Sequence, residues 1–162
     1  MARWIEIEQE VPELAARARS IFDAYKHKTL ATLRADGSPR VSGIEADFWN
    51  DDLWLGSMPD SRKGADLKHD PRFALHSATV DSELAEGDAK VSGRAELVIG
   101  AGFDAYVAHL HESAEQVPEG AFDLFRADLT ELVVIRIGDP ADHLVIETWR
   151  AGRPGLLRVE RR

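Results

Sequence analysis

Short runs in which apolar and polar residues alternate occupy much of the first third of the chain. The runs at 29–33 and 40–49 are separated by a segment that contains Asp36-Gly37. An Asp-Gly pair between two such runs is typical of a β-hairpin, because glycine adopts positive φ at little cost. A second turn at 50–52 leads to a third run at 53–57. The pattern predicts a three-stranded antiparallel meander.

The remainder of the chain indicates further short strands with helices inserted between them. We expect strands at 72–80, 88–99, 129–137 and 143–149, helices at 12–26, 62–69, 103–111 and 121–126, and an acidic loop at 81–87. Short antiparallel strands that must hide their edges favour a closed or partly open barrel. We therefore predict one mainly-β domain over residues 1–162, a β-barrel of six to seven strands at about 28–149 with added helices.

Composition restricts the chemistry. The 162 residues contain no cysteine and carry a net charge of −9. The missing thiols exclude disulfide scaffolds, cysteine-ligated zinc, iron–sulfur clusters and thiol catalysis. An acidic chain lacks the basic field on which non-specific nucleic-acid binding relies. No apolar run approaches the ~18 residues of a spanning helix, and the N-terminus has no apolar signal core. We expect a cytoplasmic protein that binds neither nucleic acid nor membrane.

Positive charge is concentrated near the C-terminus. Residues 150–162 hold five Arg and one Glu, a charge of +4, which leaves −13 on the rest of the chain. Two interpretations of this basic tail stay open. It is a solvated end of an acidic body, or one of its arginines reaches an anionic ligand.

One segment gathers the side chains that bind phosphate in proteins. A strand ends at Ser57, a tight loop follows, and a helix begins with Ser61-Arg62-Lys63. Unpaired N–H groups and the positive end of the helix dipole attract an anion there. The serines add hydroxyl donors, and Arg62 and Lys63 add positive charge. The sequence predicts a phosphate site. The alternative is an exposed, capped helix whose cations pair with Asp60, Asp66 or Asp70.

Other common signatures are absent from the sequence. It contains no G-x-G-x-x-G, no G-x-x-x-x-G-K-[ST] and no G-x-S-x-G. His109 and His111 are the only close histidine pair, and at this spacing their rings point to different faces of a helix. We predict no metal site, because helical ligands stand four residues apart.

The order of these motifs resembles the pyridoxamine 5′-phosphate oxidase-like family of FMN-binding split β-barrels. The matching segments are 29–33, 36–39, 53–57, 61–63, Leu67, 70–72 and the strand 91–97. The resemblance implies a six-stranded Greek-key barrel, a homodimer, and a flavin bound in a cleft between the two subunits.

The resemblance also assigns roles to residues. Ser57 matches the hydroxyl that touches the FMN phosphate, and Ser61, Arg62 and Lys63 match the start of the helix that grips it. The segment Ser42-Gly43-Ile44 matches the backbone that runs beside the isoalloxazine ring, where Gly43 permits close approach.

Near the C-terminus, a late Trp-and-Arg pair of the family acts across the dimer. Trp149 matches the tryptophan, and Arg158 matches the arginine, with Arg150 and Arg153 as alternatives. Trp149 is equally explained as a core aromatic.

Two departures from the family's pattern shape the functional hypothesis. Ser42 and Asp47 stand where pyridoxamine phosphate oxidases carry Arg and Lys, and no His follows Trp149. A carboxylate is electrostatically wrong where a substrate phosphate should meet a cation. We therefore favour the flavin and deazaflavin reductase side of the family. The expected function is a flavin-dependent oxidoreductase that uses FMN, or alternatively an 8-hydroxy-5-deazaflavin coenzyme. The second hypothesis is a non-catalytic flavin- or haem-binding protein on the same barrel.

Overall fold

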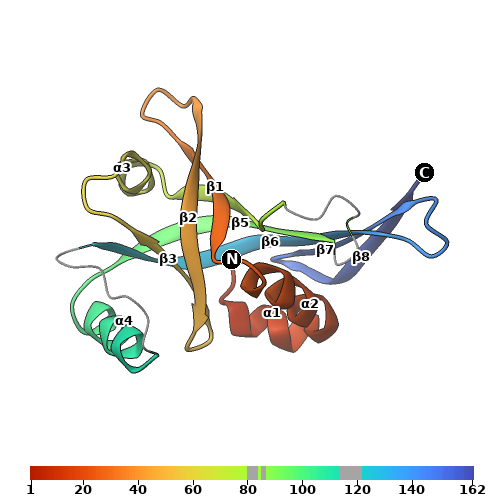
Figure 1. Ribbon diagram of the computed structural model, residues 1–162, viewed down its shortest axis with the longest axis horizontal. Coiled ribbons are helices and arrows are strands. Elements are labelled where there is room, and N and C mark those ends of the chain that lie inside the picture. The colour runs from red at the N-terminus through yellow and green to blue at the C-terminus, as the bar shows by residue number, and fades with distance from the viewer. Residues whose placement is uncertain (80–83, 85–86, 114–121) are drawn as a thin grey trace.

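The expected meander forms the first three strands of the computed structural model, which describes residues 1–79, 84, 87–113 and 122–162. The strands are β1 (His27–Leu33), β2 (Pro39–Trp49) and β3 (Asp52–Ser57). Gly37 has a φ of +80°, as the Asp-Gly turn requires, and Asn50 and Asp51 also have positive φ at the next turn. The meander is thus specified locally by its turns (Figure 1).

The sheet closes into a barrel because one long strand pairs with two others. The later strands are β4 (Arg72–His76), β5 (Asp88–Val98) and β6 (Asp123–Ile137). β4 pairs with both β1 and β5, and β6 pairs with both β5 and β3, all antiparallel. Six strands therefore close in the order β3-β2-β1-β4-β5-β6 and back to β3. Closure removes the exposed edges of these strands, and the predicted split-barrel fold is confirmed.

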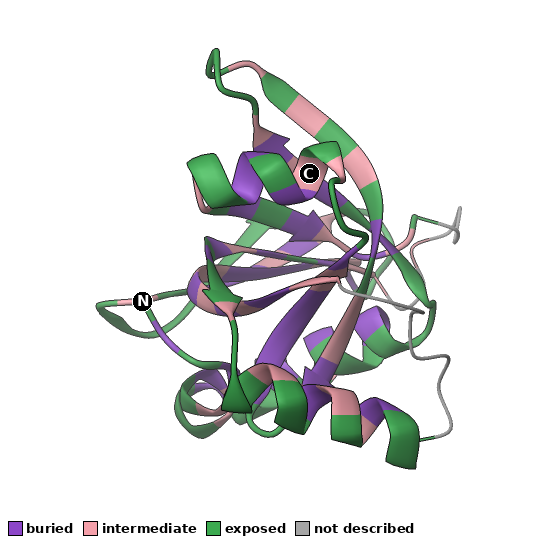
Figure 2. Cartoon of the chain, turned by 90° about the vertical axis from the view of Figure 1, so that its left-hand side faces the viewer, coloured by how far each residue is buried: buried purple, intermediate pink, exposed green. Residues whose placement is uncertain are grey.

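The core fills the barrel and continues beneath two N-terminal helices (Figure 2). Fully buried leucines from four strands meet inside it: Leu30, Leu55, Leu75 and Leu132. The helices α1 (Trp4–Glu10) and α2 (Pro12–Asp23) pack Trp4, Leu14 and Phe22 into the same cluster. Burying each such side chain stabilises the fold by about 1.5–3 kcal/mol.

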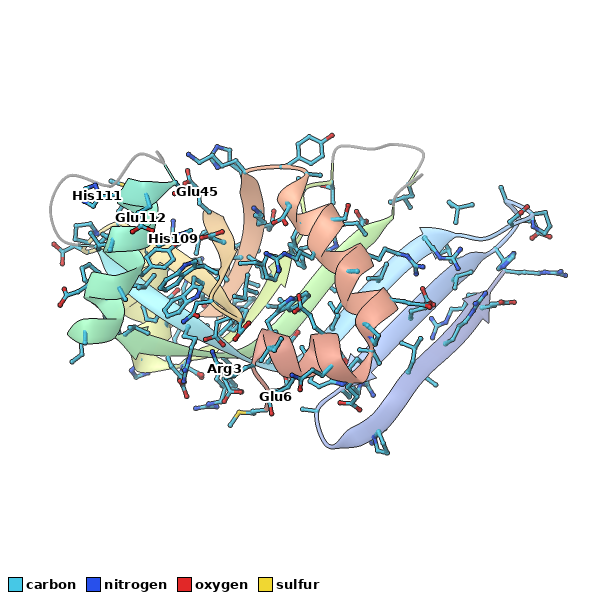
Figure 3. All side chains as sticks on the ribbon, turned by 90° about the horizontal axis from the view of Figure 1, so that it is seen from below. Arg3, Glu6, Glu45, His109, His111 and Glu112 are labelled. Atoms are coloured by element: carbon cyan, nitrogen blue, oxygen red, sulfur yellow. The ribbon has the colours of Figure 1, made fainter. Side chains whose placement is uncertain are left out.

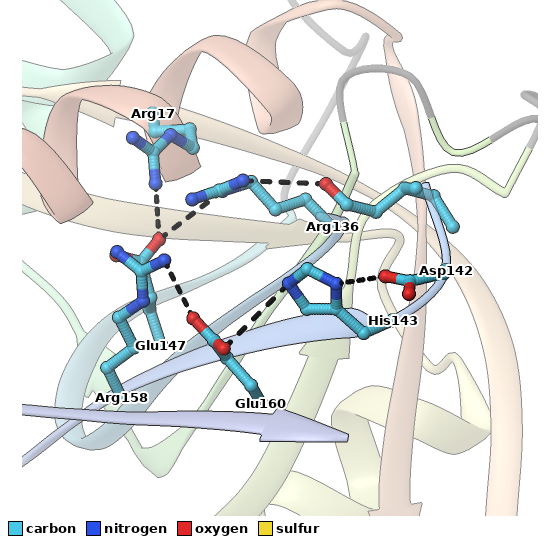
Figure 4. Close-up of polar contacts among 8 residues, drawn as sticks. Arg17, Arg136, Asp142, His143, Glu147, Arg158 and Glu160 are labelled. Carbon is cyan, nitrogen blue, oxygen red and sulfur yellow. Dashed lines mark hydrogen bonds and ion pairs between the residues drawn. The ribbon is translucent and has the colours of Figure 1, made fainter. Parts of the chain in front are cut away.

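Two further strands extend the sheet beyond the barrel. β7 (Leu144–Arg150) pairs with β6, and β8 (Arg153–Arg161) pairs with β7. Buried Glu147 of β7 receives the guanidinium of Arg17 from α2 and lies 3.8 Å from that of Arg136 on β6 (Figure 4). These ion pairs tie the extension to the helical layer.

The basic tail is exposed to solvent, but the sequence prediction missed that it forms a strand. Residues 153–161 form β8, which follows a tight turn with Gly152 at a φ of +77°. Its backbone groups are paired with β7 along their length, although every residue of the strand is exposed. The strand could not be recognised from its composition, because arginines indicate exposure to solvent and do not indicate the conformation of the backbone.

The predicted helix at 121–126 is also wrong. Residues 123–126 begin β6, and Leu124 and Phe125 are both fully buried. Leu124 lies under α4 (Ala101–Glu112) and Phe125 lies in the barrel. Burial on both faces removes the alternation by which a strand is recognised.

Smaller differences concern boundaries. The N-terminal helix ends at Asp23 and not at 26, and α1 precedes it without having been predicted. The helix at 103–111 is confirmed as α4. The expected strand at 72–80 ends already at His76. Residue 80, most of the loop 81–87 and residues 114–121 lie outside the described residues. Within the described part, no helix is long and apolar enough to cross a membrane.

Candidate functional site

The site is built on α3 (Arg62–His69), which follows β3 directly. Ser61 caps the helix, and its side-chain oxygen accepts the Gly64 N–H at 3.0 Å. Asp66 on the next turn accepts the Thr32 hydroxyl at 2.8 Å and the Arg40 guanidinium at 2.6 Å. These two hydrogen bonds attach α3 to both strands of the β1–β2 hairpin.

Asp66 is buried, and its ionisation depends on these partners. Burial alone would raise the pKa of Asp66, but the hydrogen bonds from Arg40 and Thr32 outweigh it, and the pKa is lowered from its ordinary value. The ionised form of Asp66 therefore makes the hydrogen bonds that hold α3 against β1 and β2.

Three oxygens converge on Gly64 in the first turn of α3. A Cβ at this glycine would lie 2.8 Å from Asp123 Oδ2, 3.0 Å from Ser61 Oγ and 3.3 Å from Ser57 Oγ. The two serine oxygens are themselves 2.5 Å apart. Only glycine leaves room for this arrangement, which we call the serine cup (Ser57, Ser61, Gly64 and the Asp123 carboxylate).

Asp123 lies at the back of the serine cup. It is the residue of β6 opposite Ser57 of β3, and its Oδ1 accepts Lys68 Nζ at 2.7 Å. Its Oδ2 is buried and has no hydrogen-bond partner among the described residues. One of the two serine hydroxyls donates its hydrogen to the other serine. The hydrogen of the second hydroxyl can then be donated to another acceptor.

Two cations stand at the start of the helix. Lys63 Nζ donates to the Gly43 carbonyl of β2 at 3.0 Å. Arg62 is exposed, and no described residue forms a hydrogen bond or ion pair with it. The predicted alternative, in which both cations pair with nearby aspartates, is therefore not what the described contacts show.

Two glycines without side-chain neighbours lie beside the serine cup, on β2 and β3. Gly43 faces outward, because its neighbour Ile44 lies in the core, and Gly56 of β3 faces outward between two inward residues. No other atom lies within 4 Å of a Cβ built on either glycine. Gly56 is opposite Glu45 of β2, two residues from Gly43. We call this surface the glycine shelf (Gly43 and Gly56).

The predicted residues thus divide into two groups. Ser57, Ser61, Arg62, Lys63 and Gly43 are brought together at one end of the barrel. Beside Gly43, the side chains of Ser42 and Ile44 alternate to the opposite face of β2.

Trp149 and Arg158 lie elsewhere, on β7 and β8. Trp149 is 2% exposed, and its ring N–H donates to Glu10 at 2.8 Å. Arg158 pairs with Glu160 at 3.1 Å (Figure 4). Within this single chain neither residue reaches the serine cup, and their roles across a dimer remain predictions.

Three residues of the site were missed by sequence reasoning. Gly64 and Gly56 carried a signal, because a glycine inside a helix or strand interior suggests a close approach of another group. Asp123 carried none, because its partners Ser57 and Lys68 are distant in sequence.

The family follows from a direct comparison. The family model for pyridoxamine 5′-phosphate oxidase matches residues 14–136, which include the barrel and the serine cup. The chain belongs to the pyridoxamine 5′-phosphate oxidase family. None of the curated proteins matches its sequence.

Solved structures with the same fold differ in what they bind. A haem-binding protein from Mycobacterium smegmatis is 22% identical with a TM-score of 0.59; the match covers 90% of this chain and 57% of that protein. PhzG from Burkholderia lata 383, in complex with tetrahydrophenazine-1-carboxylic acid, is 14% identical with a TM-score of 0.62 (96% and 91% covered). An F420 reductase is 19% identical with a TM-score of 0.53 (70% and 94% covered). These likenesses concern the fold alone.

Proposed function

We propose that this protein is a flavin-dependent oxidoreductase that binds FMN, with the phosphate at the serine cup and the ring along the glycine shelf. The observation that carries the proposal is Arg62, which has no partner among the described residues and lies beside two serine hydroxyls at the start of α3, in a chain whose net charge is −9. A phosphate is the ligand that hydroxyls, a guanidinium and a helix N-terminus bind together.

The hydroxyls and cations at the start of α3 fit the phosphate of FMN, because Lys68 offsets the charge of the Asp123 carboxylate, and the glycine shelf fits its ring. Arg62 and Lys63 would neutralise the phosphate, and the spare serine hydroxyl would donate to it. The absence of side chains at Gly43 and Gly56 would let a planar ring approach the backbone. FMN would supply the hydride chemistry, while the chain would fix its orientation and exclude water.

We further propose that a second copy of this chain covers the site. Met58 directly follows Ser57 of the serine cup, Val41 lies two residues before Gly43 on β2, and they are 75% and 71% exposed. A second copy placed over the site would remove both side chains from water. A homodimer would enclose the ring between subunits.

Two other ligands share parts of this argument. A deazaflavin coenzyme would use the same phosphate donors, and the similarity to an F420 reductase supports it. Haem is the second candidate class, supported by the similarity to a haem-binding protein, and it would make no use of the phosphate donors at the serine cup.

Equilibrium titrations distinguish these candidates. The purified protein is titrated with FMN, the deazaflavin and haemin, followed by absorption and fluorescence. We expect FMN to bind, and the double variant Arg62→Ala/Lys63→Ala to weaken binding at least tenfold. The control Lys90→Ala/Arg94→Ala removes the same charge from exposed positions of β5 and should leave FMN binding unchanged. Haemin binding without FMN binding would refute the proposal.

A further inference from the structure

A second constellation lies beyond the far end of the glycine shelf, on α4. The helix packs Tyr106 and Leu110 onto Trp54, and this docking places His109 against β2. The His109 ring stacks on Trp49, with ring centroids 4.9 Å apart and planes 14° apart. His109 Nε2 lies 3.2 Å from Asp47 Oδ2. Stacking on Trp49 therefore fixes the plane of the imidazole, and the contact with Asp47 fixes its orientation within that plane.

Asp47 fixes which ring nitrogen of His109 carries hydrogen. A carboxylate accepts only, so Nε2 is the donor in this contact. Nδ1 has no hydrogen-bond partner among the described residues. An imidazole oriented by a carboxylate, with its other nitrogen unpaired, is the arrangement of an acid–base residue.

The position of this pair relates it to the proposed cofactor site. Gly43, Glu45 and Asp47 alternate onto the same outward face of β2. Asp47 lies two residues beyond the level of Gly56, about 7 Å along the strand. The side chains of His109 and Asp47 are 24% and 33% exposed. They are thus accessible from the surface that continues the shelf. Figure 3 shows His109 on the β2 side of α4 and His111 farther out.

We propose that His109 is the acid–base residue of this protein and exchanges a proton with the substrate at Nδ1, while Asp47 positions it. The inference rests on the proposed function. The substrate class that such a residue serves is a molecule that takes up a proton when it is reduced, such as one with a carbonyl oxygen. In its reduction, the substrate receives a hydride from the reduced flavin and a proton from Nδ1, and His109 regains that proton from water. Two electrons and two protons then complete the reduced product.

The test compares two acceptors in single turnovers. FMN-loaded protein is photoreduced without oxygen and mixed with menadione, which takes up protons, or with ferricyanide, which takes up electrons alone. In His109→Gln we expect reoxidation by menadione to slow about 100-fold, within the range of general acid catalysis, and reoxidation by ferricyanide to stay within twofold. The control His111→Gln removes an exposed histidine from the same helix and should change neither rate.

The outcomes separate this inference from the proposed function. FMN affinity is measured first, and a wild-type protein without FMN affinity refutes the proposed function alone. ¹⁵N NMR of the cofactor-free protein still tests the pair: we expect the neutral His109 ring to carry its proton on Nε2. A ring protonated on Nδ1 overturns the inference. Equal slowing of both acceptors in His109→Gln, or unchanged menadione rates, also overturns it.

Discussion

The replacement Gly64→Ala separates the fold from the site. Alanine is favoured over glycine within a helix by about 1 kcal/mol. The new Cβ, however, would lie 2.8 Å from Asp123 Oδ2 and 3.0 Å from Ser61 Oγ. Neither oxygen moves freely, because Lys68 holds Asp123 at 2.7 Å and the Gly64 N–H holds Ser61. Such crowding costs about 1–3 kcal/mol, so we expect the free energy of unfolding to fall by only about 1 kcal/mol.

The larger effect of Gly64→Ala falls on FMN. The added methyl group would push the serine hydroxyls away from their positions and so remove the hydrogen bond that one of them donates to the phosphate. A hydrogen bond to a charged group is worth about 1.5–3 kcal/mol. We therefore expect the dissociation constant for FMN to rise at least tenfold. Urea denaturation gives the first quantity and a flavin fluorescence titration gives the second.

Ala65→Gly is the matched control for this variant. Ala65 is the exposed neighbour on the same turn, so its loss should cost about 1 kcal/mol of helix propensity and leave FMN affinity unchanged. The reasoning is refuted if Gly64→Ala binds FMN as tightly as the wild type and is stabilised by about 1 kcal/mol.

Further predictions concern stability. Asp66→Asn should lower the free energy of unfolding by about 3 kcal/mol in urea, because it leaves Arg40 uncompensated beside α3. The lowered pKa of Asp66 means that its contribution is present above the unfolded-state pKa of about 3.9. That contribution is lost as the pH falls through the lower folded-state value. Acid unfolding curves should show this loss in the wild type and not in Asp66→Asn. Leu55→Ala, at a fully buried position, should cost about 2–5 kcal/mol in the same denaturation assay. Lys90→Ala, at an exposed position of β5, should change it by less than about 0.5 kcal/mol.

The parts of the fold that the sequence predicted are those encoded locally. The Asp36-Gly37 turn, the meander it joins and the cap of α3 each depend on neighbouring residues. β6 was predicted only over its second half, because its first residues are buried by the barrel core on one face and by α4 on the other. β8 was missed because its pairing with β7 is a tertiary contact.

The candidate site divides in the same way. Ser57, Ser61, Arg62 and Lys63 are contiguous with the β3–α3 turn, so the motif contained them. Asp123 joins them only through the β3–β6 pairing that closes the barrel. His109 and Asp47 are 62 residues apart and meet only because α4 docks on Trp54. A contact between residues so far apart in sequence cannot be predicted from a local pattern.

The phosphate itself is the most direct test of the central claim, because riboflavin is FMN without it. The dissociation constants of both ligands are measured for the wild type and for Arg62→Ala/Lys63→Ala. Two charge-assisted contacts predict that the wild type binds FMN about 100-fold more tightly than riboflavin, and that this ratio falls below tenfold in the double variant. Equal affinity of the wild type for FMN and riboflavin, or a ratio that the double variant preserves, would contradict a phosphate site at the start of α3.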